Sequence, residues 1–266
     1  MGDIQALRDK NDTDLVQGLY RIFNEDTRLN WSRAARVEFL TTMHDLEKYL
    51  HPGAKVLDIG AGAGEYSLQL ADMGCDVTAV ELAEANIAAF RRKIRPEQKI
   101  DLRQGNALDL SAFSDGAFDV VLLMGPLYHL HSEADRQRAI AEAKRVCRKG
   151  GMIFFAFISN DMLMLTEFAC YNPAYFSEGK YDRATFKVED WPFVFATLDS
   201  ARKMLSDGGI AVLHEVASDG VSELLADKIN SLDDAGFAEY LRYHLYCCEK
   251  KEMLGRSSHL LFIAQK

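Results

Sequence analysis

Two acidic residues and three alternating glycines stand where two apolar runs end, and they are the residues best placed for chemistry. In the stretch VLDIGAGAGEYSLQLADMGCDVTAVE, Asp58 lies near the end of the first run, Gly60, Gly62 and Gly64 follow it, and Glu81 ends the second run. Glycine lets a backbone approach a ligand closely because it carries no side chain. A glycine-rich turn of this kind holds a phosphate, a dinucleotide or a different ligand. The surrounding residues decide among these.

The glycine turn fits neither a phosphate-binding loop nor a dinucleotide-binding loop. A phosphate-binding loop ends in a lysine followed by a hydroxyl residue, and no lysine follows Gly64. A dinucleotide loop has a third glycine that allows a helix and a strand to pack closely, and counting from Gly60 that position is Glu65. A carboxylate opening the helix is a poor neighbour for a pyrophosphate. The remaining pattern is D-x-G-x-G-x-G.

Alternating strand and helix patterns are expected to position these residues. Apolar runs predict strands at residues 55–59, 77–81, 101–104, 120–123, 152–158, 210–216 and 259–264. Helical patterns predict helices at residues 65–73, 83–93, 134–147, 198–205 and 233–248. The Gly150–Gly151 pair is expected to end the third of these helices. The alternation predicts an α/β fold: a Rossmann-like, doubly wound, seven-stranded and mostly parallel sheet with helices on both faces, the last two strands being candidates for a reversed hairpin at its edge.

Two segments fall outside this alternation. Residues 11–50 have apolar positions at helical spacing and predict an N-terminal helical cap, and residues 160–197 form an aromatic insert after the fifth strand. Both can reach the carboxyl ends of the strands, where doubly wound folds bind ligands. We therefore expect a single domain over residues 1–266, with the cofactor-binding core at 51–159 and the C-terminal part of the sheet at 198–266.

The composition is that of a globular protein without a basic region. The 266 residues include 40 acidic and 31 basic side chains, and the net charge of -9 makes nucleic acid a disfavoured partner. No apolar run approaches the ~20 residues that span a bilayer, and the first residues lack the apolar core of a signal peptide. The five cysteines show no CxxC spacing. We expect a cytoplasmic monomer or homodimer with reduced thiols and no membrane partner.

The D-x-G-x-G-x-G turn, Glu81 and the sequence RQGNALDL after the third strand together resemble the motifs of class I S-adenosylmethionine-dependent methyltransferases. The resemblance covers residues 45–160 and implies S-adenosylmethionine as the cofactor. It implies that the carboxylate of Asp58 and the loop carbonyls suit the ammonium and the sulfonium, that Glu81 accepts the ribose hydroxyls, and that Phe113 can pack on the adenine. Many members of the family have Asp where this chain has Asn106. The implied cofactor site is Asp58, Gly60, Ala61, Gly62, Gly64, Glu81, Leu82, Asn106, Ala107 and Met124.

The sequence MGPLYHL after the fourth predicted strand is expected to face the methyl group. Methyltransferases acting on exocyclic amines often carry Asn-Pro-Pro-Tyr here, whereas the GPLYHL form is similar to a bacterial group of generic class I enzymes whose acceptors are commonly small molecules. Methyl transfer chiefly needs the acceptor held in line, and a base helps where the acceptor keeps a proton. His129 is the candidate base, because imidazole titrates near neutral pH, and Tyr128 is a second candidate catalytic residue. A buried, hydrogen-bonded histidine and a packing tyrosine are the alternatives.

A charged segment ahead of the first strand supplies candidate substrate contacts. The stretch YRIFNEDTRLNW is predicted to fold over the cofactor, and Tyr20, Arg28 and His129 are the candidate substrate-binding residues. Arg28 could bind a substrate carboxylate through two hydrogen bonds, although a solvated helix end is the alternative. His244 and Cys248 have the spacing of a metal pair, but their apolar neighbours favour packing, so no metal site is predicted.

The predicted function is an S-adenosylmethionine-dependent methyltransferase that transfers a methyl group to oxygen, nitrogen or sulfur of a small molecule by in-line displacement. Two alternatives stay open. An RNA methyltransferase would need a basic patch that the overall composition hides. A non-catalytic S-adenosylmethionine-binding protein would share the same cofactor residues.

Overall fold

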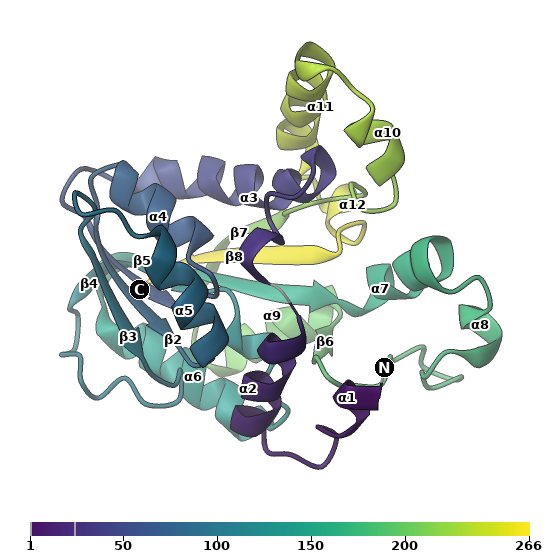
Figure 1. The fold of residues 1–266 in the computed structure, drawn as a ribbon, viewed down its shortest axis with the longest axis horizontal. Helices are drawn as coiled ribbons and strands as arrows, with labels where there is room; N and C mark the ends of the chain where they lie inside the picture. The colour runs from purple at the N-terminus through teal and green to yellow at the C-terminus, as the bar shows by residue number, and fades with distance from the viewer. Residues whose placement is uncertain (1, 24) are drawn as a thin grey trace.

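One mixed sheet forms the centre of the computed structural model, which describes residues 2–23 and 25–266 (Figure 1). The strand order is β3-β2-β1-β4-β5-β8-β7, with β6 paired to β5 beside this path. Among these strands β8 alone runs antiparallel to its neighbours, β5 and β7. The strands are β1 (Lys55–Ile59), β2 (Asp76–Glu81), β3 (Ile100–Gln104), β4 (Phe118–Leu123), β5 (Cys147–Ser159), β6 (Phe195–Ala196), β7 (Val212–Ala217) and β8 (His259–Gln265).

The predicted doubly wound fold is confirmed, with two corrections. The seven predicted strands correspond to β1–β5, β7 and β8, while β6, two residues long, is too short to leave a sequence pattern. The last two strands do pair antiparallel, but β8 lies between β5 and β7, so only β7 forms that edge of the sheet.

The Gly150–Gly151 pair does not end a helix, contrary to the prediction. The helix α6 ends at Val146, and β5 begins at Cys147, so both glycines lie inside the strand. A Cβ at Gly151 would meet the carbonyl oxygen of Asp119, next to the point where the register of β4 and β5 shifts. The glycine is therefore needed for the close approach of two strands at an irregularity.

Helices cover both faces of the sheet. Successive residues of a strand point to opposite faces, so Leu57 of β1 packs on the side of α6 and α9, and Val56 packs on the side of α3 and α4. The helices are α1 (Gly2–Gln5), α2 (Asp12–Ile22), α3 (Arg33–Leu46), α4 (Glu65–Asp72), α5 (Glu84–Lys93), α6 (Glu133–Val146), α7 (Asn160–Thr166), α8 (Tyr175–Glu178), α9 (Leu198–Asp207), α10 (Ala226–Asn230), α11 (Asp234–Cys247) and α12 (Lys251–Leu254), with the 3-10 turns η1 (Glu25–Thr27), η2 (Glu47–Tyr49) and η3 (Pro126–Tyr128) and the π-turn η4 (Glu167–Tyr171).

The segments outside the sheet gather near the carboxyl end of β5. In Figure 1 the insert with α7 and α8 extends from the tip of β5, α10 and α11 project above it, and α1 and α2 lie below. Capping side chains define where the N-terminal helices begin: Asn11 accepts the backbone N–H of Asp14 at the start of α2, and Ser32 accepts that of Ala35 at the start of α3. No helix in the described part of the chain has the length and apolarity needed to cross a membrane.

Candidate active site

A cavity of about 500 Å³, here called the edge cavity, opens at the carboxyl ends of β1, β2 and β4. Its walls come from the glycine turn, the loops after β2, β3 and β4, and the helix α2. Every predicted cofactor residue except Gly64 lines it: Asp58, Gly60, Ala61, Gly62, Glu81, Leu82, Asn106, Ala107 and Met124. The sheet thus brings together residues that lie far apart in the sequence.

The glycine turn contacts Glu81 on one side and the loop after β4 on the other. Gly60 has a positive φ of 74°, and a Cβ there would press into the ring of Pro126. The backbone N–H of Gly62 donates to Oε2 of Glu81 over 2.7 Å. Positive φ and the close approach of Pro126 together explain why a residue with a side chain does not fit at Gly60.

Gly64, also a predicted cofactor residue, does not line the edge cavity and lies against a neighbouring helix. It caps α4 with a φ of 87°, and a Cβ at this position would overlap the ring of Phe90 on α5. The third glycine therefore lets two helices approach each other. In a dinucleotide loop the third glycine also permits close packing, but there it lies between a helix and a strand.

The two acids of the edge cavity are buried and oriented by hydrogen bonds. Asp58 is 3% exposed, and its Oδ2 accepts the hydroxyl of Ser67 at 2.7 Å. Glu81 is 4% exposed, and its Oε1 accepts the backbone N–H of Ala83 at 2.7 Å. Burial raises the pKa of Asp58 to about 6 and also raises the pKa of Glu81. Each carboxylate oxygen can accept more than one hydrogen bond, so both retain capacity for a ligand.

The loop after β3 carries Asn106 and Ala107 to the wall of the edge cavity. Oδ1 of Asn106 accepts the backbone N–H of Leu108 at 3.0 Å, which fixes the turn. Phe113, expected near the adenine, does not belong to this wall: its ring meets Phe118 edge-on with the centroids 5.4 Å apart, and Arg103 lies 5.0 Å above it. Phe113 is therefore a packing residue of the β3 side.

His129 is placed at the edge cavity but is a poor general base. It is 6% exposed, its Nε2 lies 2.8 Å from the hydroxyl of Tyr20, and its Nδ1 is buried without a partner in the described chain. Burial lowers the pKa of His129 to about 3, so the neutral ring takes up a proton weakly near pH 7. The geometry favours the alternative of a buried histidine, one that holds Tyr20 against the loop after β4.

Tyr128 connects the loop after β4 to the aromatic insert. Its backbone carbonyl accepts the N–H of Val194 at 2.9 Å, and its ring meets that of Phe193 edge-on at 6.3 Å. Burial raises the pKa of Tyr128, so its hydroxyl stays protonated. Tyr128 lines the edge cavity from this position.

Arg28 lines the edge cavity, but its guanidinium already has two partners. Nε donates to Oε1 of Glu25 at 2.7 Å, and Nη1 donates to Oε2 of Glu38 at 2.9 Å. A substrate carboxylate would have to compete with two acids of the same chain. The predicted role of Arg28 in binding an acidic substrate is therefore disfavoured, and the residue organises the wall instead.

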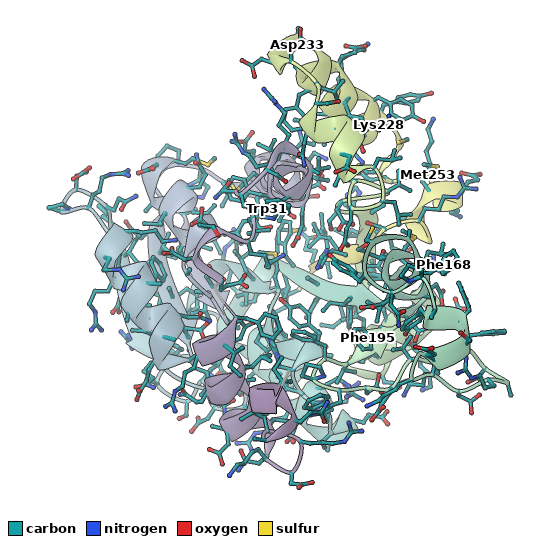
Figure 2. All side chains as sticks on the ribbon, turned by 45° about the vertical axis from the view of Figure 1, so that its right-hand side comes forward. Trp31, Phe168, Phe195, Lys228, Asp233 and Met253 are labelled. Atoms are coloured by element: carbon teal, nitrogen blue, oxygen red, sulfur yellow. The ribbon has the colours of Figure 1, made fainter. Side chains whose placement is uncertain are left out.

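Two further cavities continue from the edge cavity. The side cavity, about 730 Å³, is bounded by Trp31 of the N-terminal cap, residues 169–171 of η4 and residues 226–227 of α10. Figure 2 labels Trp31 of this wall, and it labels Phe168 and Lys228, which are the sequence neighbours of residues 169–171 and 226–227. The insert cavity, about 740 Å³, lies against α7 and the residues before β6. The edge and side cavities share Tyr20, Glu25, Arg28, Glu38, Tyr128 and His259.

Three residues at this junction were not found from the sequence: Glu38, Asp219 and His259. His259 begins β8 and pairs with Ile158 near the end of β5. Because β8 is antiparallel to β5, its first residue lies at the same edge as the last residues of the parallel strands. The predicted reversal of the final strands was the signal that could have placed His259 at the site.

His244 and Cys248 are buried, and Cys248 belongs to the core against α3 and α4.

The mixed sheet and its edge cavity define a Rossmann-like methyltransferase fold, and the comparisons with known proteins agree. A SAM-dependent methyltransferase from Methanosarcina mazei is 21% identical, with a TM-score of 0.53 covering 84% of this chain and 96% of that one. Magnesium protoporphyrin IX methyltransferase from Synechocystis PCC 6803, solved with bound SAH, is 14% identical, with a TM-score of 0.60 covering 96% and 100%.

The sequence comparison finds similarity to methyltransferases over the first part of the sheet. Residues 57–155 match the family described as a methyltransferase domain. Ubiquinone biosynthesis O-methyltransferase from Aromatoleum aromaticum is 33% identical over 110 residues, which are 41% of this chain and 46% of that protein. The chain thus spans about half the length of the curated relatives it matches. Residues 57–155 are thus similar to a methyltransferase domain, and the relatives of known function match this same part of the chain.

Proposed function

We propose that this protein transfers a methyl group from S-adenosylmethionine to oxygen, nitrogen or sulfur of a small molecule by in-line displacement. The observation that carries the proposal is the edge cavity, in which the glycine turn, two buried acids and the loop after β4 meet. The matched methyltransferase domain covers these same elements.

The residues of the edge cavity suit this cofactor in charge and shape. Asp58 and Glu81 bring two carboxyl groups to the wall of the edge cavity, and such groups are suitable partners for an ammonium, a sulfonium and two ribose hydroxyls. Gly60 carries no side chain, which allows Pro126 of the loop after β4 to lie close against the turn that forms this wall of the edge cavity. The wall formed by Asn106 and Ala107 would receive the adenine, and when bound the cofactor supplies an electrophilic methyl group.

The side cavity is the proposed place of the acceptor. It meets the edge cavity along a shared wall, and its volume is within the usual range for small-molecule sites. The carboxylates of Glu25, Glu38, Asp219, Glu223 and Asp227 outnumber the cations Arg28 and His259 among its lining residues. This charge is unfavourable for a polyanion, which supports a small molecule over RNA as the acceptor.

We further propose that the enzyme works in the cytoplasm. Its five cysteines, Cys75, Cys147, Cys170, Cys247 and Cys248, are free thiols in the structure. Free thiols are the usual state in a reducing compartment.

The test has two stages. Calorimetric titration with S-adenosylmethionine and S-adenosylhomocysteine measures cofactor binding, and a screen of phenols, amines, thiols and transfer RNA then follows the formation of S-adenosylhomocysteine. We expect binding of both compounds and turnover with a small molecule. Binding without turnover in any class would favour the non-catalytic alternative, and turnover with RNA alone would favour the RNA enzyme. Absence of binding would contradict the proposal.

A further inference from the structure

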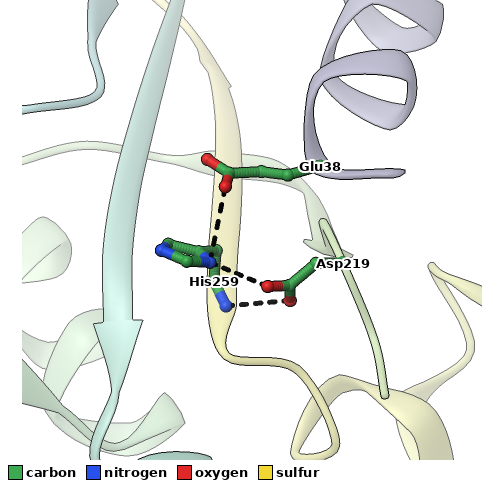
Figure 3. A group of neighbouring side chains, drawn as sticks. All are labelled: Glu38, Asp219 and His259. Carbon is green, nitrogen blue, oxygen red and sulfur yellow. Dashed lines mark hydrogen bonds and ion pairs between the residues drawn. The ribbon is translucent and has the colours of Figure 1, made fainter. Parts of the chain in front are cut away.

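His259 sits where all three cavities meet and is the residue this inference concerns. It lines the edge, side and insert cavities, and its side chain is 25% exposed. Nδ1 lies 2.8 Å from Oδ2 of Asp219 and 3.5 Å from Oε2 of Glu38. Figure 3 shows both carboxylates on one side of the ring, while the other ring nitrogen points away from them. Nδ1 is thus held by the two carboxylates, and Nε2 faces away from them (Figure 3).

Asp219 is itself fixed in place, so it can orient the ring. Its Oδ1 accepts the hydroxyl of Ser257 at 2.6 Å and the backbone N–H of His259 at 3.0 Å. A carboxylate held on Nδ1 keeps the proton of the neutral ring on that nitrogen and leaves the lone pair on Nε2. In other enzymes, an aspartate that orients a histidine in this way enables the histidine to act as a general base.

We propose that His259 is the general base that takes the proton of an acidic hydroxyl acceptor, a phenol or an enol, and that Asp219 is its positioning residue. The inference rests on the proposed methyl transfer. An oxygen lone pair of the acceptor forms a bond to the methyl carbon, and the carbon–sulfur bond breaks with its electron pair passing to sulfur. The hydroxyl proton passes to Nε2 of His259. The products are the methyl ether, S-adenosylhomocysteine and an imidazolium paired with Asp219.

The charges around His259 match it to an acidic hydroxyl. Glu38 of α3 and Asp219 after β7 face the ring, Arg28 opposes them, and Glu223 lies nearby at the hydroxyl of Ser258. Burial lowers the pKa of His259, but the two carboxylates outweigh it and raise the pKa to about 9. A phenol titrates near 10, as tyrosine does. Proton transfer from a phenol to this imidazole is therefore close to balanced, whereas an ordinary imidazole would leave the proton on the phenol.

The walls near His259 suit an aromatic ring. Phe23, Tyr171 and Phe193 line both the side cavity and the insert cavity. Aromatic side chains pack on flat apolar ligands in offset or edge-on geometry. A phenol that extends from the methyl group past His259 would lie among these rings.

A divalent cation is the competing occupant of the same three side chains. The ligand atoms of Glu38, Asp219 and His259 lie within 4.8 Å of one another. However, Glu38 already accepts Nη1 of Arg28, and Nδ1 of His259 faces both carboxylates. The guanidinium of Arg28 and the N–H on Nδ1 of His259 therefore already occupy these carboxylates, and a cation would have to displace that proton and compete with Arg28. The experiment includes a chelator for this reason.

The experiment uses protein loaded with S-adenosylhomocysteine and 4-nitrophenol as the probe, because its phenolate absorbs visible light. Absorbance is followed against pH for the wild type and for the variants His259→Gln and Asp219→Asn. His214→Gln is the matched control, since His214 forms a similar pair with Glu249 at 2.8 Å on the exposed edge strand. We expect the ionised fraction of the bound probe to be roughly tenfold higher in the wild type and His214→Gln than in His259→Gln, with Asp219→Asn between them.

Turnover of a phenol with S-adenosylmethionine gives the second readout. In His259→Gln we expect kcat to fall roughly 100-fold with little change in KM. The rate of the wild type should rise with pH up to about 9, and this rise should be absent in His259→Gln. If His259→Gln does not fold, Asp219→Asn must lower kcat and shift the rise of the rate to lower pH.

Several outcomes would overturn the proposal. These are an unchanged kcat and pH profile in both variants, a bound probe whose ionisation is the same in all proteins, or no binding of the probe to the loaded protein. Activity abolished by EDTA and restored by Mg²⁺ would replace the base with a metal site. Failure of S-adenosylhomocysteine to bind would instead contradict the proposed function, and that first step is measured separately.

Discussion

Replacing Asp58 by Asn should stabilise the free protein near neutral pH while it weakens cofactor binding. Asp58 is buried at the end of β1, and its folded pKa of about 6 is above the ordinary 3.8. The folded state therefore binds this proton more tightly than the unfolded state. The stability that the proton provides is fully present below about 3.8 and is lost as the pH rises through about 6.

The structure sets the size of the effect. The difference between about 6 and 3.8, at 1.36 kcal/mol for each pKa unit, corresponds to about 3 kcal/mol. Asn has nearly the same volume, and its amide oxygen can still accept the hydroxyl of Ser67. That bond loses a charged acceptor, which costs roughly 1 kcal/mol. We therefore expect the free energy of unfolding of Asp58→Asn to exceed that of the wild type by about 1–3 kcal/mol at neutral pH.

Urea unfolding without ligand, at several pH values from about 5 to about 8, measures this difference. The gap between wild type and Asp58→Asn should widen as the pH rises through about 6 and then stay constant. Asp9→Asn, at an exposed residue, is the control and should show no such pH-dependent gap. The reasoning is refuted if Asp58→Asn is less stable than the wild type by an amount that does not change with pH.

Three further predictions concern the same site. Gly64→Ala should lower the free energy of unfolding by about 2–4 kcal/mol, because strain at positive φ adds to overlap with Phe90, whereas Gly53→Ala, at a similar φ of 81° with open space around it, should cost only about 1 kcal/mol in the same urea assay. Glu81→Gln should weaken S-adenosylhomocysteine binding roughly 30- to 100-fold in calorimetry, because a charged acceptor for the ribose hydroxyls is lost; an effect no larger than that of a control at the exposed Glu47, Glu47→Gln, would contradict this role. Tyr20→Phe should lower unfolding stability by about 1–2 kcal/mol, because it leaves Nε2 of the buried His129 unpaired, and an unchanged urea midpoint would contradict the importance of that bond.

The parallel half of the sheet was predictable because each of its features is local. Apolar runs of strand length, separated by helical patterns, placed β1, β2 and β4, and the acids Asp58 and Glu81 stand at or near the ends of their strands. The carboxyl ends of parallel strands share one edge. A short motif therefore places its residues at the site without knowledge of the rest of the fold.

The residues around the proposed acceptor site were less predictable, because their roles depend on contacts between distant segments. His129 has the type of a base, but its contact with Tyr20, 109 residues away in the sequence, and its burial, which lowers its pKa, disfavour that role. Arg28 has the type of a carboxylate-binding residue, but Glu38 of α3 occupies it. His259 reaches the site only because β8 runs against its neighbours.

The packing glycines show the same limit at shorter range. Gly64 sits in a motif that predicts ligand contact, yet its neighbour is Phe90 from the following helix. Gly150 and Gly151 have the composition of a helix stop, yet they lie inside β5 where two strands approach closely. Residue type predicted backbone freedom in both cases, and tertiary packing decided how that freedom is used.

A crystal structure of the protein with S-adenosylhomocysteine is the most direct test of the central claim. We expect the ligand in the edge cavity, with its ribose hydroxyls on Glu81, its adenine beside Asn106 and Ala107, and its sulfur directed toward the wall shared with the side cavity. A ligand bound elsewhere, or an edge cavity that stays empty at saturating concentration, would contradict the account.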